Sequence, residues 1–132
     1  MSEKYKSLGS QIKSHNLSSK DYYKGGWIMK VEIYQARNDL DEQHDILFLS
    51  YEHVKLRIQN LKNNFKDYYK KTYEYNEVFD SQNTNRILES IFERFNIDRP
   101  DDFKGHSLSV SDIVILDDEM YFCDSVGFTK IE

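Results

Sequence analysis

Cysteine and proline are almost absent from this chain of 132 residues, which has one of each, and it contains no long apolar run. A single cysteine, Cys123, excludes an internal disulfide framework. No run approaches the roughly 20 apolar residues of a membrane-spanning helix, and the Lys-rich start lacks the apolar core of a signal peptide. We therefore expect a cytoplasmic domain with no membrane partner.

Aromatic residues are abundant, with 10 Tyr and 8 Phe. Aromatic side chains bury more area each than aliphatic ones do, so a modest apolar fraction still allows a compact core. The length suits one domain with one core. The composition therefore predicts a folded domain and not a disordered chain.

Charge is distributed unevenly along the chain. Residues 1–30 carry six Lys against two acidic residues, residues 31–73 balance seven against seven, and residues 74–132 carry fourteen acidic residues against five basic ones. An acidic C-terminal part disfavours nonspecific DNA binding and favours a basic partner surface, including one that normally holds nucleic acid. The alternative is that these acidic side chains only keep a small domain in solution.

The first half of the chain predicts an arm, two strands and a helix. Residues 1–26 are polar and Lys-rich, typical of a flexible or partner-ordered arm. Residues 27–36 alternate with the period of a half-buried strand, and the short apolar run within 45–50 predicts a second strand. A helical period begins at Tyr51 and extends to Leu61.

The second half predicts strands around a clear helix. Residues 71–79 alternate as a strand. A helix is predicted from Thr84, as N-cap, to Asn96 by an apolar stripe that comprises Ile87, Leu88, Ile91, Phe92 and Phe95. Residues 113–116 and 120–123 predict a hairpin, followed by a last short strand at 129–131. The fold class is α+β: a small, mostly antiparallel sheet with two helices, formed by residues 27–132 after the arm.

The loop from Asp98 to Asp112 contains His106 and three serines, which invites a catalytic interpretation. A serine nucleophile needs a base within hydrogen-bond reach and a third group to orient that base, and no nucleophile-elbow motif is present. A structural role explains more: Pro100 fixes a turn, Phe103 anchors the loop in the core, and Gly105 permits a special backbone geometry. We expect no catalytic residue here.

Acidic residues near this loop form a candidate binding surface. The spacing of calcium loops is absent, and four scattered His with one Cys do not form a zinc set, so neither a metal nor another cofactor is expected. A divalent-metal nuclease site assembled across the fold is the least favoured alternative. The candidate acidic surface comprises Asp98, Asp101, Asp102, Asp117, Asp118 and Glu119.

A stretch that mixes basic and aromatic residues precedes the strand at 71–79. Lysines neutralise phosphates and aromatic rings stack on bases, so this mixture is typical of a nucleic-acid contact. The favoured alternative is that the tyrosines belong to a strand and cover the core. The candidate basic aromatic stretch comprises Lys62, Lys66, Tyr68, Tyr69, Lys70 and Lys71.

Several runs of this sequence resemble the YodL-like domain family. The resemblance extends over about Val31–Glu132, and its C-terminal motif is the specific part. That motif comprises Phe95–Pro100, Asp102–Val114, Tyr121, Asp124, Ser125 and Gly127–Phe128. Residues 1–26 and the Lys/Tyr-rich middle depart from the family pattern. The resemblance implies mobile elements and phages of Gram-positive bacteria, and it brings no established catalytic residue set.

These observations lead to one favoured function and two alternatives. We expect a non-enzymatic protein from a mobile element that inhibits a host defence nuclease, as anti-CRISPR proteins do. Its partner would be a CRISPR effector nuclease or its ribonucleoprotein, whose nucleic-acid-binding surface the acidic residues would occupy. The alternatives are a nucleic-acid-binding accessory protein acting through the basic aromatic stretch, and a metal-dependent nuclease.

Overall fold

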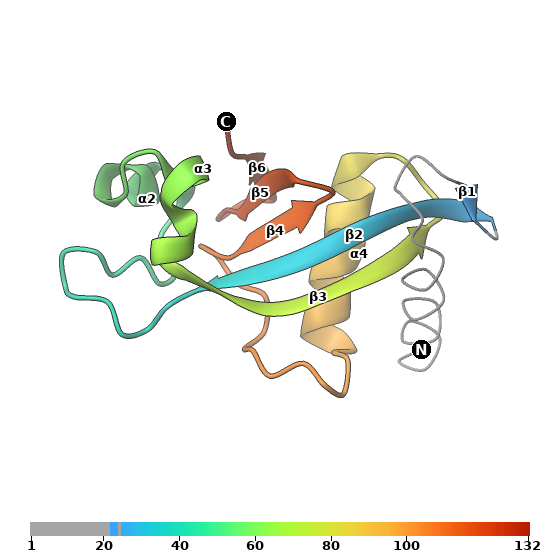
Figure 1. Ribbon diagram of the computed structural model, residues 1–132, viewed down its shortest axis with the longest axis horizontal. Coiled ribbons are helices and arrows are strands. Elements are labelled where there is room, and N and C mark those ends of the chain that lie inside the picture. Colours follow the sequence, from blue (N-terminus) through green and yellow to red (C-terminus); the bar gives the residue numbers. More distant parts are fainter. Residues whose placement is uncertain (1–21, 24) are drawn as a thin grey trace.

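The long strand β2 (Gly26–Ala36) is the centre of the sheet in the computed structural model, which describes residues 22–23 and 25–132 (Figure 1). β3 (Tyr69–Phe79) pairs along one edge of β2, while β1 (Tyr22–Tyr23) and β4 (Ile113–Leu116) pair along the other. All pairings are antiparallel. The sheet continues from β4 through β5 (Glu119–Cys123) to β6 (Phe128–Lys130).

Within the described residues, three α-helices and one 3-10 helix accompany the sheet. They are α2 (Tyr51–Arg57), α3 (Leu61–Asn64), the 3-10 helix η1 (Phe65–Asp67) and α4 (Thr84–Ile97). The single helix predicted from Tyr51 to Leu61 is divided into α2 and α3. The backbone of Ile58 is extended and Asn60 has a left-handed φ of 54°, and neither conformation continues a helix.

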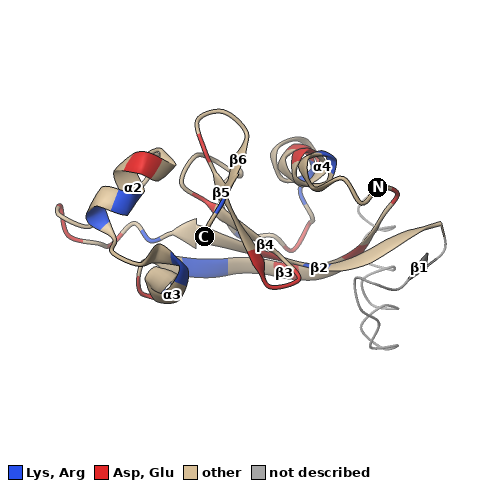
Figure 2. Ribbon diagram, turned by 90° about the horizontal axis from the view of Figure 1, so that it is seen from above, with Lys and Arg blue, Asp and Glu red and all other residues tan. Residues whose placement is uncertain are grey.

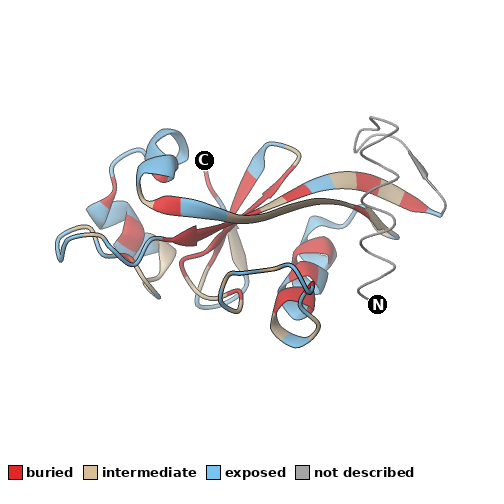
Figure 3. Ribbon diagram, turned by 60° about the horizontal axis from the view of Figure 1, so that its bottom comes forward, coloured by how far each residue is buried: buried red, intermediate tan, exposed pale blue. Residues whose placement is uncertain are grey.

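The buried side chains form two clusters on opposite faces of the sheet. Successive residues of a strand point to opposite faces. Accordingly, Ile113 and Ile115 of β4 belong to the cluster under α2, α3 and η1, whereas Val114 and Leu116 belong to the cluster under α4. Figure 2 shows α4 on one side of β2 and β3, and Figure 3 shows its buried and exposed sides. Both faces of the sheet centre are therefore covered.

The strand predicted at residues 45–50 is wrong. This segment makes local turns: the Leu47 N–H binds the Asp45 carboxylate at 3.2 Å, and the Leu49 N–H binds the Ile46 carbonyl at 3.1 Å. Ile46 is fully buried, but Phe48 is 65% exposed with a φ of 64°. Local side-chain and backbone acceptors therefore replace a ladder partner for this apolar run.

The other strands and the clear helix are confirmed with small shifts in their ends. Asn83 caps α4 in place of Thr84, because its side chain accepts the Arg86 N–H. Most of the predicted arm, residues 1–21 and 24, lies outside the described residues. Its end joins the sheet, since Tyr22–Tyr23 form β1 and Gly26 begins β2. The α+β class is confirmed. None of the helices in the described part is long and apolar enough to cross a bilayer.

Candidate functional site

A few large apolar side chains remain outside the two clusters. Among the described residues, the large hydrophobic side chains that are exposed are Phe48, Leu56, Phe92, Ile97 and Val126. Three of them, Phe48, Phe92 and Ile97, line the same groove, and Val126 belongs to the loop that forms one wall of it. Exposed apolar side chains gathered at one place mark interaction sites more often than scattered ones do.

This groove runs between α4 and two segments that follow it, residues 108–110 and 123–128, and has a volume of about 810 Å³. Helix α4 turns Ile91 and Phe95 into the sheet. Because a helix advances by 100° per residue, Phe92 and Ile97 fall outside that inward stripe. The Phe92 ring meets the ring of Phe128 at 6.4 Å between centroids, which forms the apolar wall.

The charge around the groove has one sign. Glu89, Glu93 and Asp124 line it, and no Lys, Arg or His is among its lining residues. Asp124 has a structural task, because it accepts hydrogen bonds from the N–H groups of Tyr51 and Ser125. Glu89 and Glu93 are exposed on α4. The groove therefore offers apolar contact within an acidic rim.

Cys123 lies in the wall of the groove but is not a nucleophile. The residue is buried, and burial together with the nearby carboxylates of Asp112 and Asp124 raises the pKa of its thiol to about 12. A thiol with so high a pKa carries almost no thiolate at neutral pH. Cys123 contributes shape to this site and no reactivity.

The predicted acidic surface is divided between the two ends of α4. Asp98, Asp101 and Asp102 follow its C-terminal end, where the Tyr73 hydroxyl donates to Asp102 at 2.7 Å. Burial raises the pKa of the Tyr73 hydroxyl, and this hydrogen bond raises it further. The phenol therefore stays protonated and is the donor. An Asp98 carboxylate oxygen lies 3.5 Å from a guanidinium nitrogen of the buried Arg94.

The other three acidic residues surround the β4–β5 turn. This turn lies near the first turn of α4, because the Tyr121 hydroxyl interacts with both Glu119 and Thr84. Asp117 accepts the Lys30 N–H at 2.9 Å, and Glu119 lies 3.6 Å from Lys130. A 14-residue helix is about 20 Å long. The six residues thus form two groups, with Glu89 and Glu93 between them.

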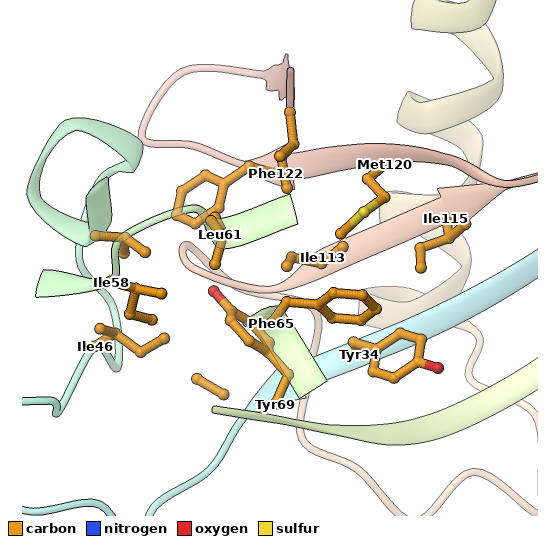
Figure 4. Packing of buried hydrophobic residues seen from close by; sticks show 13 residues of the cluster. Tyr34, Ile46, Ile58, Leu61, Phe65, Tyr69, Ile113, Ile115, Met120 and Phe122 are labelled. Carbon is orange, nitrogen blue, oxygen red and sulfur yellow. The ribbon is translucent and has the colours of Figure 1, made fainter. Parts of the chain in front are cut away.

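The predicted basic aromatic stretch uses its aromatic members for the core. Tyr69 is buried in the cluster (Figure 4) and donates its hydroxyl to the Ser111 carbonyl at 2.6 Å. Tyr68 packs half-buried against the same cluster. Lys71 pairs with Glu74 at 2.7 Å and with Glu32 at 3.2 Å. Figure 2 shows basic residues gathered on α2, α3 and the start of β3. The exposed remainder of the stretch is Lys62, Lys66 and Lys70.

Serine hydroxyls in the loop between α4 and β4 bind the backbone. The Ser109 hydroxyl donates to the Ser107 carbonyl at 2.8 Å, and the Ser111 hydroxyl accepts the Phe48 N–H. Neither serine is therefore held as a nucleophile against His106. Nor do three His, Cys, Asp or Glu side chains gather as metal ligands within residues 22–23 and 25–132.

Gln35 and Asp112 hold this loop against the sheet. Both are buried, and the Gln35 amide donates to Asp112 at 3.0 Å and to the His106 carbonyl at 2.8 Å. The Ser109 N–H donates to the same Asp112 carboxylate at 2.8 Å. Burial raises the pKa of Asp112 to about 6, although these hydrogen bonds and His106 favour its ionised form. The network is structural and positions His106 at the surface.

Comparison with known proteins shows the family of this chain. A profile of the YodL-like domain matches residues 30–132. This chain belongs to the YodL-like domain family. The YodL-like chain is also 35% identical over 119 residues to an uncharacterized protein of Acanthamoeba polyphaga mimivirus, covering 79% of this chain and 94% of that relative. No solved structure matches it significantly. The family and the viral relative fit a protein of mobile elements or viruses.

The groove was not predicted from the sequence. Phe92 was assigned to the apolar stripe of α4, and Phe48 to a strand. One signal was available: Phe92 and Ile97 fall on the side of the helix that carries Glu89 and Glu93, so they lie beyond the width of a single buried stripe. Val126 lies in a turn, where the sequence gives no information on which surface it adjoins.

Proposed function

We propose that this protein is a non-enzymatic binding protein of a mobile element that acts through the groove along α4. In its specific form, the protein is an anti-CRISPR type inhibitor. It binds a CRISPR effector nuclease or its ribonucleoprotein in the cytoplasm and occupies a nucleic-acid-binding surface. The observation that carries the proposal is the apolar groove with an acidic rim and no basic lining residue.

Charge complementarity favours a basic partner segment with apolar anchors. Surfaces that hold nucleic acid are rich in Lys and Arg. Such side chains can meet Glu89 and Glu93 while an apolar side chain enters between Phe92 and Ile97. Apolar anchors supply most of the binding energy of protein interfaces, and surrounding charges set specificity and association rate. The acidic groups at both ends of α4 extend the same sign of charge beyond the groove.

The side chains with catalytic potential support a non-enzymatic role. The thiol of Cys123 is held protonated by burial, and the hydroxyls of Ser109 and Ser111 are bound to backbone groups. His106 is the single histidine of the loop, and its Nδ1 atom lies 4.0 Å from an Asp112 carboxylate oxygen. A base without an adjacent nucleophile does not make a hydrolytic site.

The test is direct binding of the full chain to purified CRISPR effector nucleases, with and without guide RNA, at low and high salt. We expect binding that competes with target DNA and weakens with salt. Ile97→Lys places a positive charge in the groove, and we expect it to weaken binding at least tenfold, about 1.4 kcal/mol. Leu56→Lys is the matched control, since Leu56 is an equally exposed apolar residue on α2.

Two results would contradict this proposal. Absence of binding to every effector tested would remove the anti-CRISPR version. Equal loss of binding in Ile97→Lys and Leu56→Lys would show that added positive charge, and not the groove, determines affinity. DNA cleavage by effectors, measured with the inhibitor in excess, then distinguishes inhibition from binding alone.

A nucleic-acid-binding accessory role is the second candidate. It is favoured by the exposed lysines Lys62, Lys66 and Lys70, which lie on α3, η1 and the start of β3. The burial of Tyr69 and the ion pairs of Lys71 reduce what this surface offers to a base or a phosphate. A mobility shift of single- and double-stranded DNA at two salt concentrations tests it, because phosphate contacts weaken steeply with salt.

A further inference from the structure

A second depression lies beyond Phe48, which lines both it and the groove. It is a cleft of about 580 Å³, more polar than the groove, between the end of β2, the start of β3 and the loop around His106. This volume is in the range of sites that hold small molecules. Its lining residues include Phe48, Lys70, Lys104 and His106.

The charge in the cleft is opposite to that of the groove. Arg37 and Asp39 bind each other through two hydrogen bonds, at 2.9 and 3.0 Å, and so neutralise one another. Lys70 and Lys104 are exposed, and their side-chain ammonium groups have no hydrogen-bond or ion-pair partner among the described residues. In a chain with a net charge of −5, two unpaired lysines at one cleft form a local site for an anion.

The loop beside the cleft is held in place by the buried residue Gln35 of β2. Gln35 is buried and binds the His106 carbonyl and Asp112. Gly105 lies so close to Gln35 that a Cβ at this position would come within 2.1 Å of the Gln35 side-chain oxygen. The Nδ1 atom of His106 lies 2.7 Å from the Ser107 carbonyl, which fixes the ring and leaves Nε2 without a partner among the described residues. A rigid support of this kind is typical of binding sites.

An aromatic ring stands at the mouth of the cleft. Phe48 is 65% exposed, and its left-handed backbone is fixed by the hydrogen bond of its N–H to Ser111 at 3.1 Å. Left-handed φ values at residues other than Gly cost energy and are concentrated at functional sites. The rings of Phe48 and His106 are 6.4 Å apart. Because the two rings are inclined by 55° to each other, a planar base can stack on the exposed Phe48 ring with His106 at its edge.

We propose that this cleft binds a mononucleotide, with the phosphate at Lys70 and Lys104 and the base against Phe48 and His106. Cations alone would favour any anion, whereas the exposed ring beside them selects anions that carry an aromatic base. No bond is made or broken in this binding. The cleft and the groove share one lining residue, Phe48.

Calorimetric titration of the full chain with AMP, adenosine and inorganic phosphate tests the proposal. AMP should bind with submillimolar affinity and more tightly than either fragment, because both halves of the cleft contribute. Lys104→Gln and Lys70→Gln should each weaken AMP binding roughly tenfold, the value of one charged hydrogen bond. Phe48→Ala should bring the affinity for AMP close to that for phosphate.

Lys55→Gln is the control for charge, because Lys55 is an exposed lysine on α2 outside the cleft. It should leave AMP binding unchanged, and amide NMR shifts caused by AMP should centre on Gly105 and His106. Absence of AMP binding, or equal loss in Lys55→Gln and Lys104→Gln, overturns the proposal. Binding of a single-stranded oligonucleotide without binding of AMP also overturns it and assigns these residues to a nucleic-acid strand.

Discussion

The two faces of the sheet use their aromatic residues differently. Under α2, α3 and η1, the aromatic residues are buried or half-buried: Tyr34, Phe65 and Tyr69 are buried, with 4.9 Å between the ring centroids of Tyr34 and Phe65 (Figure 4). Tyr68 is half-buried. Under α4, Phe95 is fully buried, but Phe92 on the same helix is 40% exposed and forms the groove wall with Phe128. We call the face under α2, α3 and η1 the closed face and the face under α4, which carries the groove, the open face.

The buried aromatic residues stabilise the fold, whereas the partly exposed ones can also contact a partner. A half-buried ring still contributes some apolar burial to the fold and keeps the rest of its surface for a partner. Exposed rings with no partner would favour aggregation, and the acidic residues Glu89 and Glu93 beside Phe92 oppose that. The open face therefore combines a core with a surface. The closed face carries the exposed lysines Lys62 on α3 and Lys66 on η1.

The largest effect on stability is expected at a buried residue of the open face. Phe95→Ala should reduce the free energy of unfolding by about 3–5 kcal/mol, because Phe95 is fully buried and meets the rings of Tyr73, Tyr75 and Phe103. Urea denaturation measures this. Phe65→Ala on the closed face should cost a similar amount. A loss below about 1 kcal/mol for Phe95→Ala would mean that α4 packs loosely and that the two faces differ more than described.

Patterns of sequence predicted the sheet and α4 but not the connections. The residues of β4 and β5 form short apolar runs next to turn residues, and both strands are present. The run at Ile46–Leu49 has the same composition, yet it lies in turns because Asp45 and Ile46 supply nearer acceptors than a neighbouring strand does. Composition does not distinguish these cases, since the outcome depends on which acceptors lie nearby.

The role of the loop was predicted, but the reason for its glycine was not. Phe103 anchors the loop against Phe95 at 5.0 Å, as expected. Gly105 was expected to supply a special backbone conformation, but its φ is not left-handed, and it is needed because the loop lies against Gln35. The contact of residues 35 and 105 is distant in sequence. Local patterns therefore contain no signal for it, nor for the groove, which is formed by four separate segments.

Gly105→Ala should reduce stability by about 2–3 kcal/mol, because its Cβ would collide with the Gln35 oxygen at 2.1 Å. Part of this cost should disappear in the Gln35→Ala background, which removes the closest atom but leaves the Phe103 ring, whose nearest carbon would lie 2.8 Å from the added Cβ. A double-mutant cycle by urea denaturation measures the coupling. Full additivity of the two changes would show that the loop is not seated on Gln35, and both the cleft and the open face would lose their support.

Acidic pH should stabilise the open face through Asp112. Burial raises the pKa of Asp112 to about 6 in the folded chain from 3.8, so the folded state binds this proton more tightly than the unfolded state does. Stability from this group is therefore gained as pH falls from about 6 toward 4 and is lost as pH rises through about 6. The expected difference is on the order of 2 kcal/mol.

Asp112→Asn is the control for this pH dependence, because it keeps the shape of the side chain and cannot ionise. Asp39 and Asp41 have lowered pKa values owing to Arg37 and His44, and their effect on stability has the opposite sign. The informative quantity is thus the difference between wild type and Asp112→Asn across pH 4 to 6. If the two pH curves are parallel, Asp112 ionises normally and the loop is open to water.

The smallest effect on stability is expected in the groove itself. Ile97→Lys should change the free energy of unfolding by less than about 0.5 kcal/mol, because Ile97 is 79% exposed at the last turn of α4. A lysine there lies four residues after Glu93 and near the negative end of the helix, and both interactions are favourable. Leu56→Lys should be equally neutral. If urea denaturation showed a loss above about 1 kcal/mol for Ile97→Lys alone, the groove would be part of the core, and the contrast between the two faces would fail.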